Sequence, residues 1–125
     1  MGPSAALKVE IQTRGGIVIV CLSGSLEYEE TNQAIAAAVD AAGVGGTSRI
    51  LFDMRRADLA NYYSYTVRHA EVAPQLGLHT GFVLGFVGPR AAQDVLCFME
   101  NVARNRGWKA RSFTSMVDAF KWLKA

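Results

Sequence analysis

The side chains best suited to chemistry lie in Arg49–Asp58 and in the aromatic segment after it. Asp53 and Asp58 are a pair of carboxylates, a combination that can act as general acid and general base. Arg55 and Arg56 lie between them, and guanidinium groups form charge-assisted hydrogen bonds with carboxylates. We therefore interpret these four residues as ion-paired charges of a loop rather than as catalytic groups.

Three tyrosines follow this charged segment: Tyr62, Tyr63 and Tyr65. In a helix, positions 62 and 65 share one face and position 63 turns away from it. At least one tyrosine is therefore expected at the surface, where tyrosine beside arginine is typical of recognition sites. Two interpretations stay open: a surface that binds a partner or ligand, and ordinary packing.

No metal or nucleophile motif completes a catalytic site. His69 and His79 lack metal-ligand spacing with each other or with a cysteine, and we interpret His69 as a buried or half-buried structural residue. Cys21 and Cys97 lie in apolar patterns, which favours two reduced core thiols. No Gly-x-Ser-x-Gly motif anchors a catalytic serine. We predict no enzyme activity, no metal and no cofactor.

Two glycine-containing segments are candidates for anion sites. Gly43–Ser48 lacks a lysine and precedes a strand, the reverse of the order in phosphate-binding loops, so a nucleotide role is disfavoured. Gly88-Pro89-Arg90 has the strand-to-helix position and a cation, which leaves weak anion binding open. A simple turn with proline at the start of a helix is favoured there.

Composition indicates one folded domain covering residues 1–125. Half of the residues are hydrophobic and 19% are charged, which suits a single core. The net charge of +2 argues against a dedicated nucleic-acid-binding protein. Met1–Ala6 lacks the features of a signal peptide, and no apolar run approaches the ~18 residues of a membrane span. A cytoplasmic protein is expected.

Hydrophobic periodicity predicts an α/β fold with the element order ββαβαβαβα. Strands are expected over 7–12, 17–22, 49–53, 80–87 and 109–113, and helices over 27–42, 61–73, 89–106 and 116–123. Arg14-Gly15-Gly16 predicts a tight hairpin, so the first strand is an antiparallel edge of an otherwise parallel five-stranded sheet. Right-handed crossovers are expected between the parallel strands.

Individual residues extend this prediction. Gly43 is expected to cap the first helix, and Gly85 suggests a bulge or the close approach of a neighbouring element. The stripes of the last two helices predict that Val95, Leu96, Met99 and Phe120 are core residues.

In open parallel sheets, ligands bind where the carboxyl ends of the strands meet. We therefore predict that any partner or ligand contacts that edge of the sheet. The candidate residues there are Ser23, Ser25, Asp53, Arg55, Arg56, Asp58, Tyr62, Tyr63 and Arg90.

The element order and three short motifs resemble the STAS domain. These motifs are Val20–Leu26 after the second strand, Ile50–Met54 at the third, and the ending Arg111–Leu123, which is most similar to the SpoIIAA-like branch. The resemblance implies a regulatory domain that binds a protein partner. Members called anti-sigma factor antagonists bind a kinase-type anti-sigma factor until a serine after the third strand is phosphorylated.

The segment that carries this serine falls on Asn61-Tyr62-Tyr63-Ser64 in this chain. Tyrosines stand where the family has serines, and Ser64 stands where it has glycine. The resemblance therefore implies the fold but not the phosphorylation switch.

The SpoIIAA-like branch is also grouped with lipid-transfer domains, which gives a second hypothesis. The leading one is a non-enzymatic module that binds a protein partner or a second copy of itself, and we expect a homodimer. The alternative is a carrier of a small apolar or lipid-like ligand, and a hydrolase-like enzyme ranks third. An apolar pocket beneath the second and third helices favours the carrier, whereas a flat, tyrosine-rich surface favours partner binding.

Overall fold

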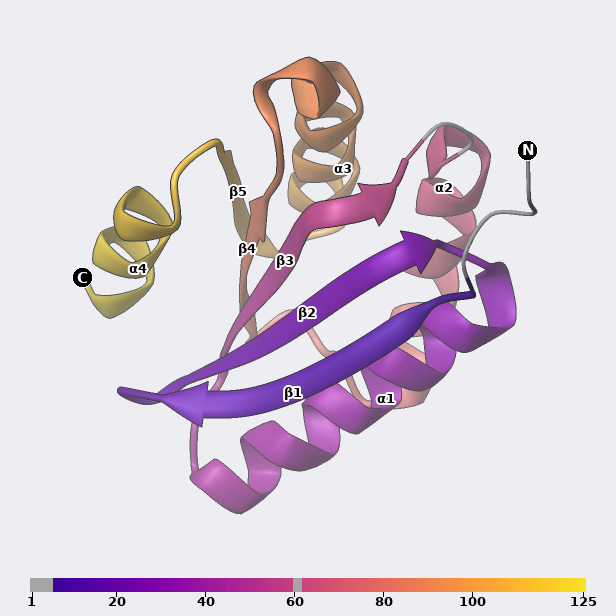
Figure 1. Cartoon of the computed structure of the whole chain (residues 1–125). Helices are drawn as coiled ribbons and strands as arrows, with labels where there is room; N and C mark the ends of the chain where they lie inside the picture. Colours follow the sequence, from indigo (N-terminus) through magenta and orange to yellow (C-terminus); the bar gives the residue numbers. More distant parts are fainter. Residues whose placement is uncertain (1–5, 60–61) are drawn as a thin grey trace.

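A computed structural model describes residues 6–59 and 62–125. They contain one five-stranded sheet in the order β1-β2-β3-β4-β5, with β1 antiparallel to β2 and the other neighbours parallel (Figure 1). The strands are β1 (Lys8–Arg14), β2 (Ile17–Ser25), β3 (Arg49–Asp58), β4 (Val83–Val87) and β5 (Lys109–Phe113). The helices are α1 (Tyr28–Gly45), α2 (Tyr62–Val72), α3 (Gln93–Asn105) and α4 (Met116–Lys124), with short 3₁₀ helices η1 (Ala73–Leu76) and η2 (Arg90–Ala92). The predicted fold class is confirmed.

The hairpin between β1 and β2 is as tight as the glycine pair predicted. Arg14 pairs with Ile17, so Gly15 and Gly16 alone form the turn. Their φ angles of 59° and 76° are the left-handed values that a two-residue hairpin turn requires. Strand β1 is thereby held as the antiparallel edge of the sheet.

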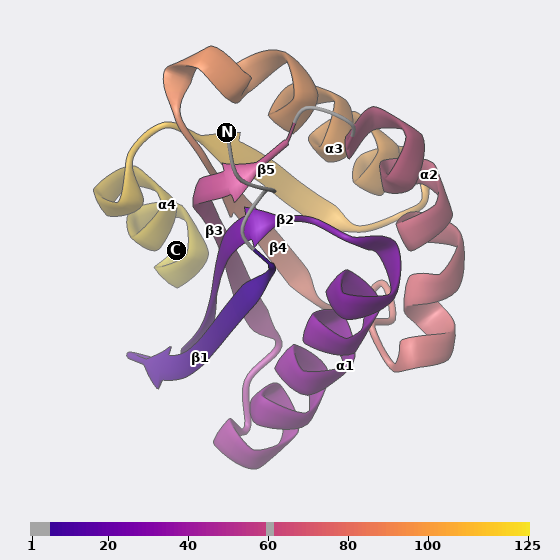
Figure 2. The same cartoon turned by 45° about the vertical axis from the view of Figure 1, so that its right-hand side comes forward.

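The helices divide unequally between the two faces of the sheet. Each of the three crossovers moves one strand further in the same direction, so α1, α2 and α3 cover one face, and α4 covers the other (Figure 2). The larger core lies under the three helices and includes Val20, Ile50 and Phe52. The smaller core joins Leu51 and the strand residues beside it to Leu123 of α4.

The predicted core residues are confirmed in α3, but one in α4 needs a correction. Val95, Leu96 and Met99 are all buried. Phe120 was expected in the core but is only half-buried, because α4 turns Ala119 and Leu123 toward the sheet. Phe120 lies at the margin of this core, with the Lys124 ammonium 5.9 Å from its ring centroid.

Gly85 is a site of close approach, one of the two roles predicted for it. A Cβ atom at this position would lie 3.0 Å from Leu51 Cδ1 and 3.2 Å from Leu123 Cδ1. Helix α4 therefore packs onto β4 at a distance that a side chain at position 85 would increase.

Several predicted boundaries are wrong. Helix α1 runs through Gly43 to Gly45, and Gly46 with φ 65° is its cap. Strand β2 continues three residues beyond 22, β3 extends to 58, and β4 begins at 83 rather than 80. The expected helix start at Asn61 lies outside the described residues.

Candidate functional site

The charged segment 53–58 is the end of a strand, not the expected loop. Cys21 pairs with Asp53, and the next pair is Ser23 with Arg56, so β3 contains one more residue than β2 between these pairs. Such a bulge lets a strand bend without losing its neighbour. Parallel pairing continues beyond it to Ser25 and Asp58.

Asp53 stabilises this bulge. Its Oδ1 accepts hydrogen bonds from the backbone N–H of Arg55 at 3.2 Å and from Arg55 Nε at 2.9 Å, and its Oδ2 accepts from Arg55 Nη2 at 2.9 Å. The Asp53 side chain is 9% exposed, whereas the Arg55 side chain is half-exposed. The predicted ion pair is therefore confirmed for Asp53 and Arg55, and the bidentate geometry is the strong form of this contact.

The ion pair determines the charge of the groups around it. Burial alone would raise the pKa of Asp53, but the hydrogen bonds from Arg55 outweigh it and lower that pKa. The Cys21 Sγ lies 3.7 Å from Asp53 Oδ2, and its pKa is raised by burial and then by the carboxylate charge. The Cys21 thiol is therefore held protonated and the Asp53 carboxylate ionised. Near neutral pH, such groups are suited to a structural role rather than to proton transfer.

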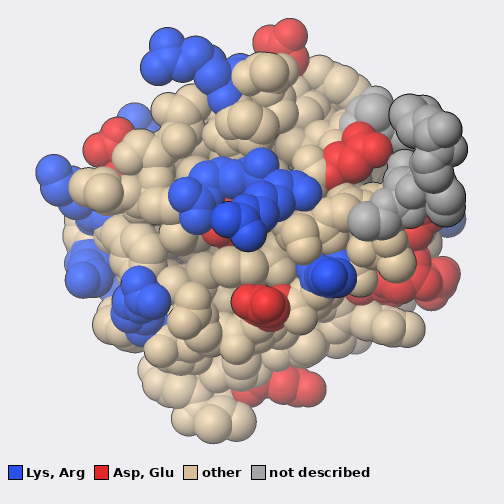
Figure 3. Space-filling model, in the orientation of Figure 1, with Lys and Arg blue, Asp and Glu red and all other residues tan. Residues whose placement is uncertain are grey.

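A polar groove of about 250 Å³ lies on the same face of the sheet as α4, in the part that α4 does not cover. It is lined by Glu10, Cys21, Leu22, Ser23, Asp53, Arg55 and Arg56. Figure 3 shows basic atoms gathered over β2 and β3 on this face, with acidic atoms partly beneath them. Four of the predicted site residues, Ser23, Asp53, Arg55 and Arg56, thus meet in one depression.

A second depression, which we call the edge groove, lies between the end of β3 and the start of α3. It measures about 390 Å³ and is lined by Ala57, Asp58, Leu59, Tyr63, Pro89, Ala91, Ala92, Asp94 and Val95. The Tyr63 ring is 47% exposed and packs 5.3 Å from the Phe98 ring centroid. Arg90 is exposed in η2, within the same β4–α3 connection.

Ser25 and Asp58 meet in a smaller depression of about 130 Å³, lined also by Leu26, Glu27, Tyr62 and Tyr65. The Ser25 hydroxyl donates to Glu27 Oε1 at 2.9 Å. Among the described residues, the predicted site residues are divided over separate depressions rather than one crevice, and Asp58 contributes to two of them.

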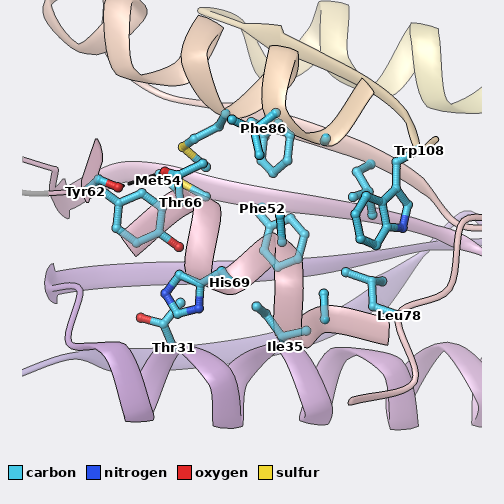
Figure 4. Close-up of a pocket in the computed structure, with 16 residues that line it drawn as sticks. Thr31, Ile35, Phe52, Met54, Tyr62, Thr66, His69, Leu78, Phe86 and Trp108 are labelled. Carbon is cyan, nitrogen blue, oxygen red and sulfur yellow. Dashed lines mark hydrogen bonds between the residues drawn. The ribbon is translucent and has the colours of Figure 1, made fainter. Parts of the chain in front are cut away.

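Tyr62 faces inward, unlike Tyr63. It is 5% exposed, and burial raises its pKa above the ordinary tyrosine value. Figure 4 shows its ring in a cavity beneath α1, α2 and α3. The cavity measures about 70 Å³ and is lined by Thr31, Ile35, Phe52, Met54, Tyr62, Thr66, His69, Ala70, Ala73, Leu78, Leu84, Phe86, Met99, Val102, Ala103 and Trp108.

One end of this cavity is polar. His69 is 5% exposed, as its structural role predicted, and its Nδ1 lies 2.7 Å from Asn32 Oδ1. Its ring stacks on Tyr28 and Tyr62, with centroid distances of 4.7 and 5.5 Å. Burial, and then the charge of Arg68, lower the pKa of His69 to about 4. His69 Nε2 and Thr31 Oγ1 are both buried without a hydrogen-bond partner.

Thr31 was missed by the sequence reasoning. The available signal was a polar residue among the buried positions of α1. That its hydroxyl lacks a hydrogen-bond partner depends on the packing of α2, which is distant in sequence. The cysteine prediction also needs correction: both thiols are free, but Cys97 is exposed on α3 and only Cys21 is half-buried.

Within residues 6–59 and 62–125, no group of three histidine, cysteine or acidic residues is arranged to hold a metal ion. No helix in the same ranges has the length and apolar character needed to cross a membrane.

No protein-family model matches the chain, and no curated protein matches it. Among solved structures, an anti-sigma factor antagonist from Mycobacterium paratuberculosis superposes with a TM-score of 0.69 at 13% identity, covering 96% of both chains. A SpoIIAA-like fold protein from Shewanella loihica superposes with a TM-score of 0.50 at 14% identity, covering 94% of this chain and 93% of that one.

These likenesses define the class of fold. The sheet order, the antiparallel first strand and the four helices of the described residues are those of an α/β fold with a mixed, mostly parallel sheet. More narrowly, the chain has the STAS/SpoIIAA-like fold, as the sequence resemblance implied.

Proposed function

We propose that this protein is a non-enzymatic regulatory module that binds a protein partner through the edge groove. The partner class we propose is an anti-sigma factor, by analogy with the Mycobacterium paratuberculosis antagonist that shares the fold. The observation that carries the proposal is the exposed Tyr63, held against Phe98 beside a groove of about 390 Å³. A rigid aromatic ring beside a hollow is typical of the residues that dominate binding energy.

The surface around Tyr63 supports a protein rather than a small molecule as the partner. Val67 lies one helical turn further along α2 and is 36% exposed, so it continues the apolar surface of Tyr63. Arg56 is exposed in β3, where it lines the neighbouring polar groove, one residue before Ala57 of the edge groove. An apolar centre with charged residues beside it is the usual composition of a protein interface.

The proposal includes regulation without the phosphorylation switch of this family. Tyr62 and Tyr63 occupy the start of α2, where the resemblance places the phosphorylated serine. Tyr62 is buried, which protects its hydroxyl from a kinase. We expect the protein isolated from its host to carry no phosphate on Tyr62, as peptide mass spectrometry would report.

The test of partner binding is a double substitution, with a control that also removes one arginine and one exposed large hydrophobic residue. Arg56→Ala with Tyr63→Ala should weaken the complex captured from host extract at least about tenfold, because both side chains leave the proposed interface. Arg49→Ala with Val44→Ala removes an exposed arginine from the other end of β3 and an exposed apolar residue from α1. This control should retain the partner, and retention of full affinity by both variants would refute the proposal.

A second candidate function, the carriage of a small apolar ligand, is favoured by the cavity beneath α2. Its walls are almost entirely apolar, and it lies where such a pocket was expected for a carrier. Its volume is far below that of a lipid-binding chamber, so the ligand must be small.

A further inference from the structure

The cavity beneath α2 has the chemistry of a specific binding site. We propose that it binds a small neutral molecule with an apolar body and a single hydroxyl or N–H donor. This inference deepens the second candidate function by stating the class of ligand, and it is independent of partner binding at the edge groove.

The need for a donor follows from His69. Asn32 Oδ1 can only accept a hydrogen bond, so His69 Nδ1 carries the proton in their 2.7 Å contact. A neutral imidazole then presents a lone pair at Nε2, which is buried in the cavity wall without a partner. A ligand hydroxyl or N–H that donates to Nε2 would satisfy this atom.

Thr31 supplies the second polar contact. This residue is 3% exposed and lines the cavity, and its hydroxyl is buried without a hydrogen-bond partner. Figure 4 shows Thr31, His69 and the Tyr62 hydroxyl gathered at one end of the cavity, with Leu78 and Trp108 at the other. Leaving a buried polar group unsatisfied is costly, so two such groups at one end favour a polar group of the ligand there.

The rest of the lining restricts the ligand to a neutral apolar body. Among the described residues of the wall, no side chain is acidic, and none is a lysine or arginine. A charged ligand would be buried without a counter-charge, which is strongly unfavourable. The body of the ligand would instead lie among Phe52, Phe86 and Trp108.

The volume restricts the ligand to few atoms. The cavity of about 70 Å³ is roughly half the ~150 Å³ of an engineered apolar cavity that binds benzene, and each water molecule occupies ~30 Å³ of liquid. The ligand must therefore be smaller than benzene, which makes ethanol a suitable probe, and its affinity is expected to be millimolar at best.

The test compares ethanol with dimethyl ether, its isomer that lacks a donor. The full chain, labelled with ¹⁵N at histidine, is titrated with each compound in a sealed tube while the His69 ring nitrogens are observed by NMR. We expect ethanol to shift the Nε2 signal saturably and to bind about five to ten times more tightly than the ether. Acetate, which is charged, should not bind.

Three variants separate a binding site from a packing defect. Thr31→Val keeps the shape of the side chain and should reduce the preference for the alcohol, while raising the melting temperature without ligand because an unsatisfied hydroxyl is lost. Thr66→Val is the matched control: this threonine also lines the cavity, but its hydroxyl donates to the Tyr62 carbonyl at 2.8 Å. It should lower the melting temperature and keep the preference. His69→Phe keeps an aromatic ring and should abolish the preference.

Equal binding of alcohol and ether to the wild-type protein would show an apolar cavity that does not select a donor, and no saturable shift with either would show a cavity that holds no such ligand. Either result would overturn the inference. Neither result would affect partner capture through Tyr63. The two proposals therefore fail separately.

Discussion

Two adjacent tyrosines have opposite environments, and this contrast separates the two candidate functions. Tyr62 is 5% exposed and lines the cavity, whereas Tyr63 is 47% exposed and lines the edge groove. The sequence predicted that positions 62 and 63 lie on different faces of a helix. It could not predict which of the two faces is buried, because that depends on where α1 and α3 lie.

His69 should make the stability of the protein depend on pH. Its pKa is about 4 in the folded protein against 6.5 for the ordinary group, so the unfolded chain binds the proton more tightly. This contribution is therefore fully present above pH 6.5 and is lost as the pH falls from 6.5 to 4, by on the order of 3 kcal/mol. Urea unfolding across this interval should show a steeper loss in the wild-type protein than in His69→Gln. Equal slopes would contradict the prediction.

At the scale of elements, the contact of α4 with β4 depends on the missing side chain of Gly85. Gly85→Ala should cost about 1–3 kcal/mol, because the new methyl group would press on Leu51 and Leu123. The matched control is Gly43→Ala in α1, where a Cβ would meet nothing within 4 Å. That change should stabilise the protein by about 0.5–1 kcal/mol, since alanine favours a helix. Similar effects of the two changes in chemical denaturation would show that the packing of α4 is not the cause.

The element order could be predicted because each element has its own hydrophobic period. The ends of β2 and β3 could not, because Ser23-Gly24-Ser25 and the charges of Arg55 and Arg56 are typical of loops. Pairing continues there because Asp53 and Arg55 stabilise a bulge that keeps both strands in contact. This arrangement depends on contacts between strands, which local sequence patterns do not report.

The sequence indicated only that an apolar pocket, if present, would favour a ligand carrier. The presence of the cavity could not be predicted. Its walls come from α1, α2, α3, β3 and β4, and its volume is the space that these side chains leave unfilled. No single segment of the sequence encodes that space. The predicted carboxyl edge, in contrast, follows from strand direction alone.

At the scale of the whole molecule, we predict self-association. The net charge of +2 gives little repulsion between copies, and Tyr63 with Val67 offers an apolar surface on α2. Sedimentation velocity should show a dimer at high protein concentration, and Tyr63→Ala should weaken the dimer at least about tenfold. Val117→Ala, on the exposed side of α4, is the control that should not. A monomer at every concentration would refute the prediction.

The sequential strand order has a consequence for how the chain is made. Each new parallel strand joins the sheet beside the strand synthesised just before it, so the sheet can grow from β1 to β5 as the chain leaves the ribosome. Its second face stays open longer, because α4 follows all five strands and supplies Ala119 and Leu123 to the smaller core. Until then Ile17, Ile19, Leu51 and Val87 lack their helix cover. We therefore expect the nascent chain to be more prone to aggregate before α4 is complete than after it.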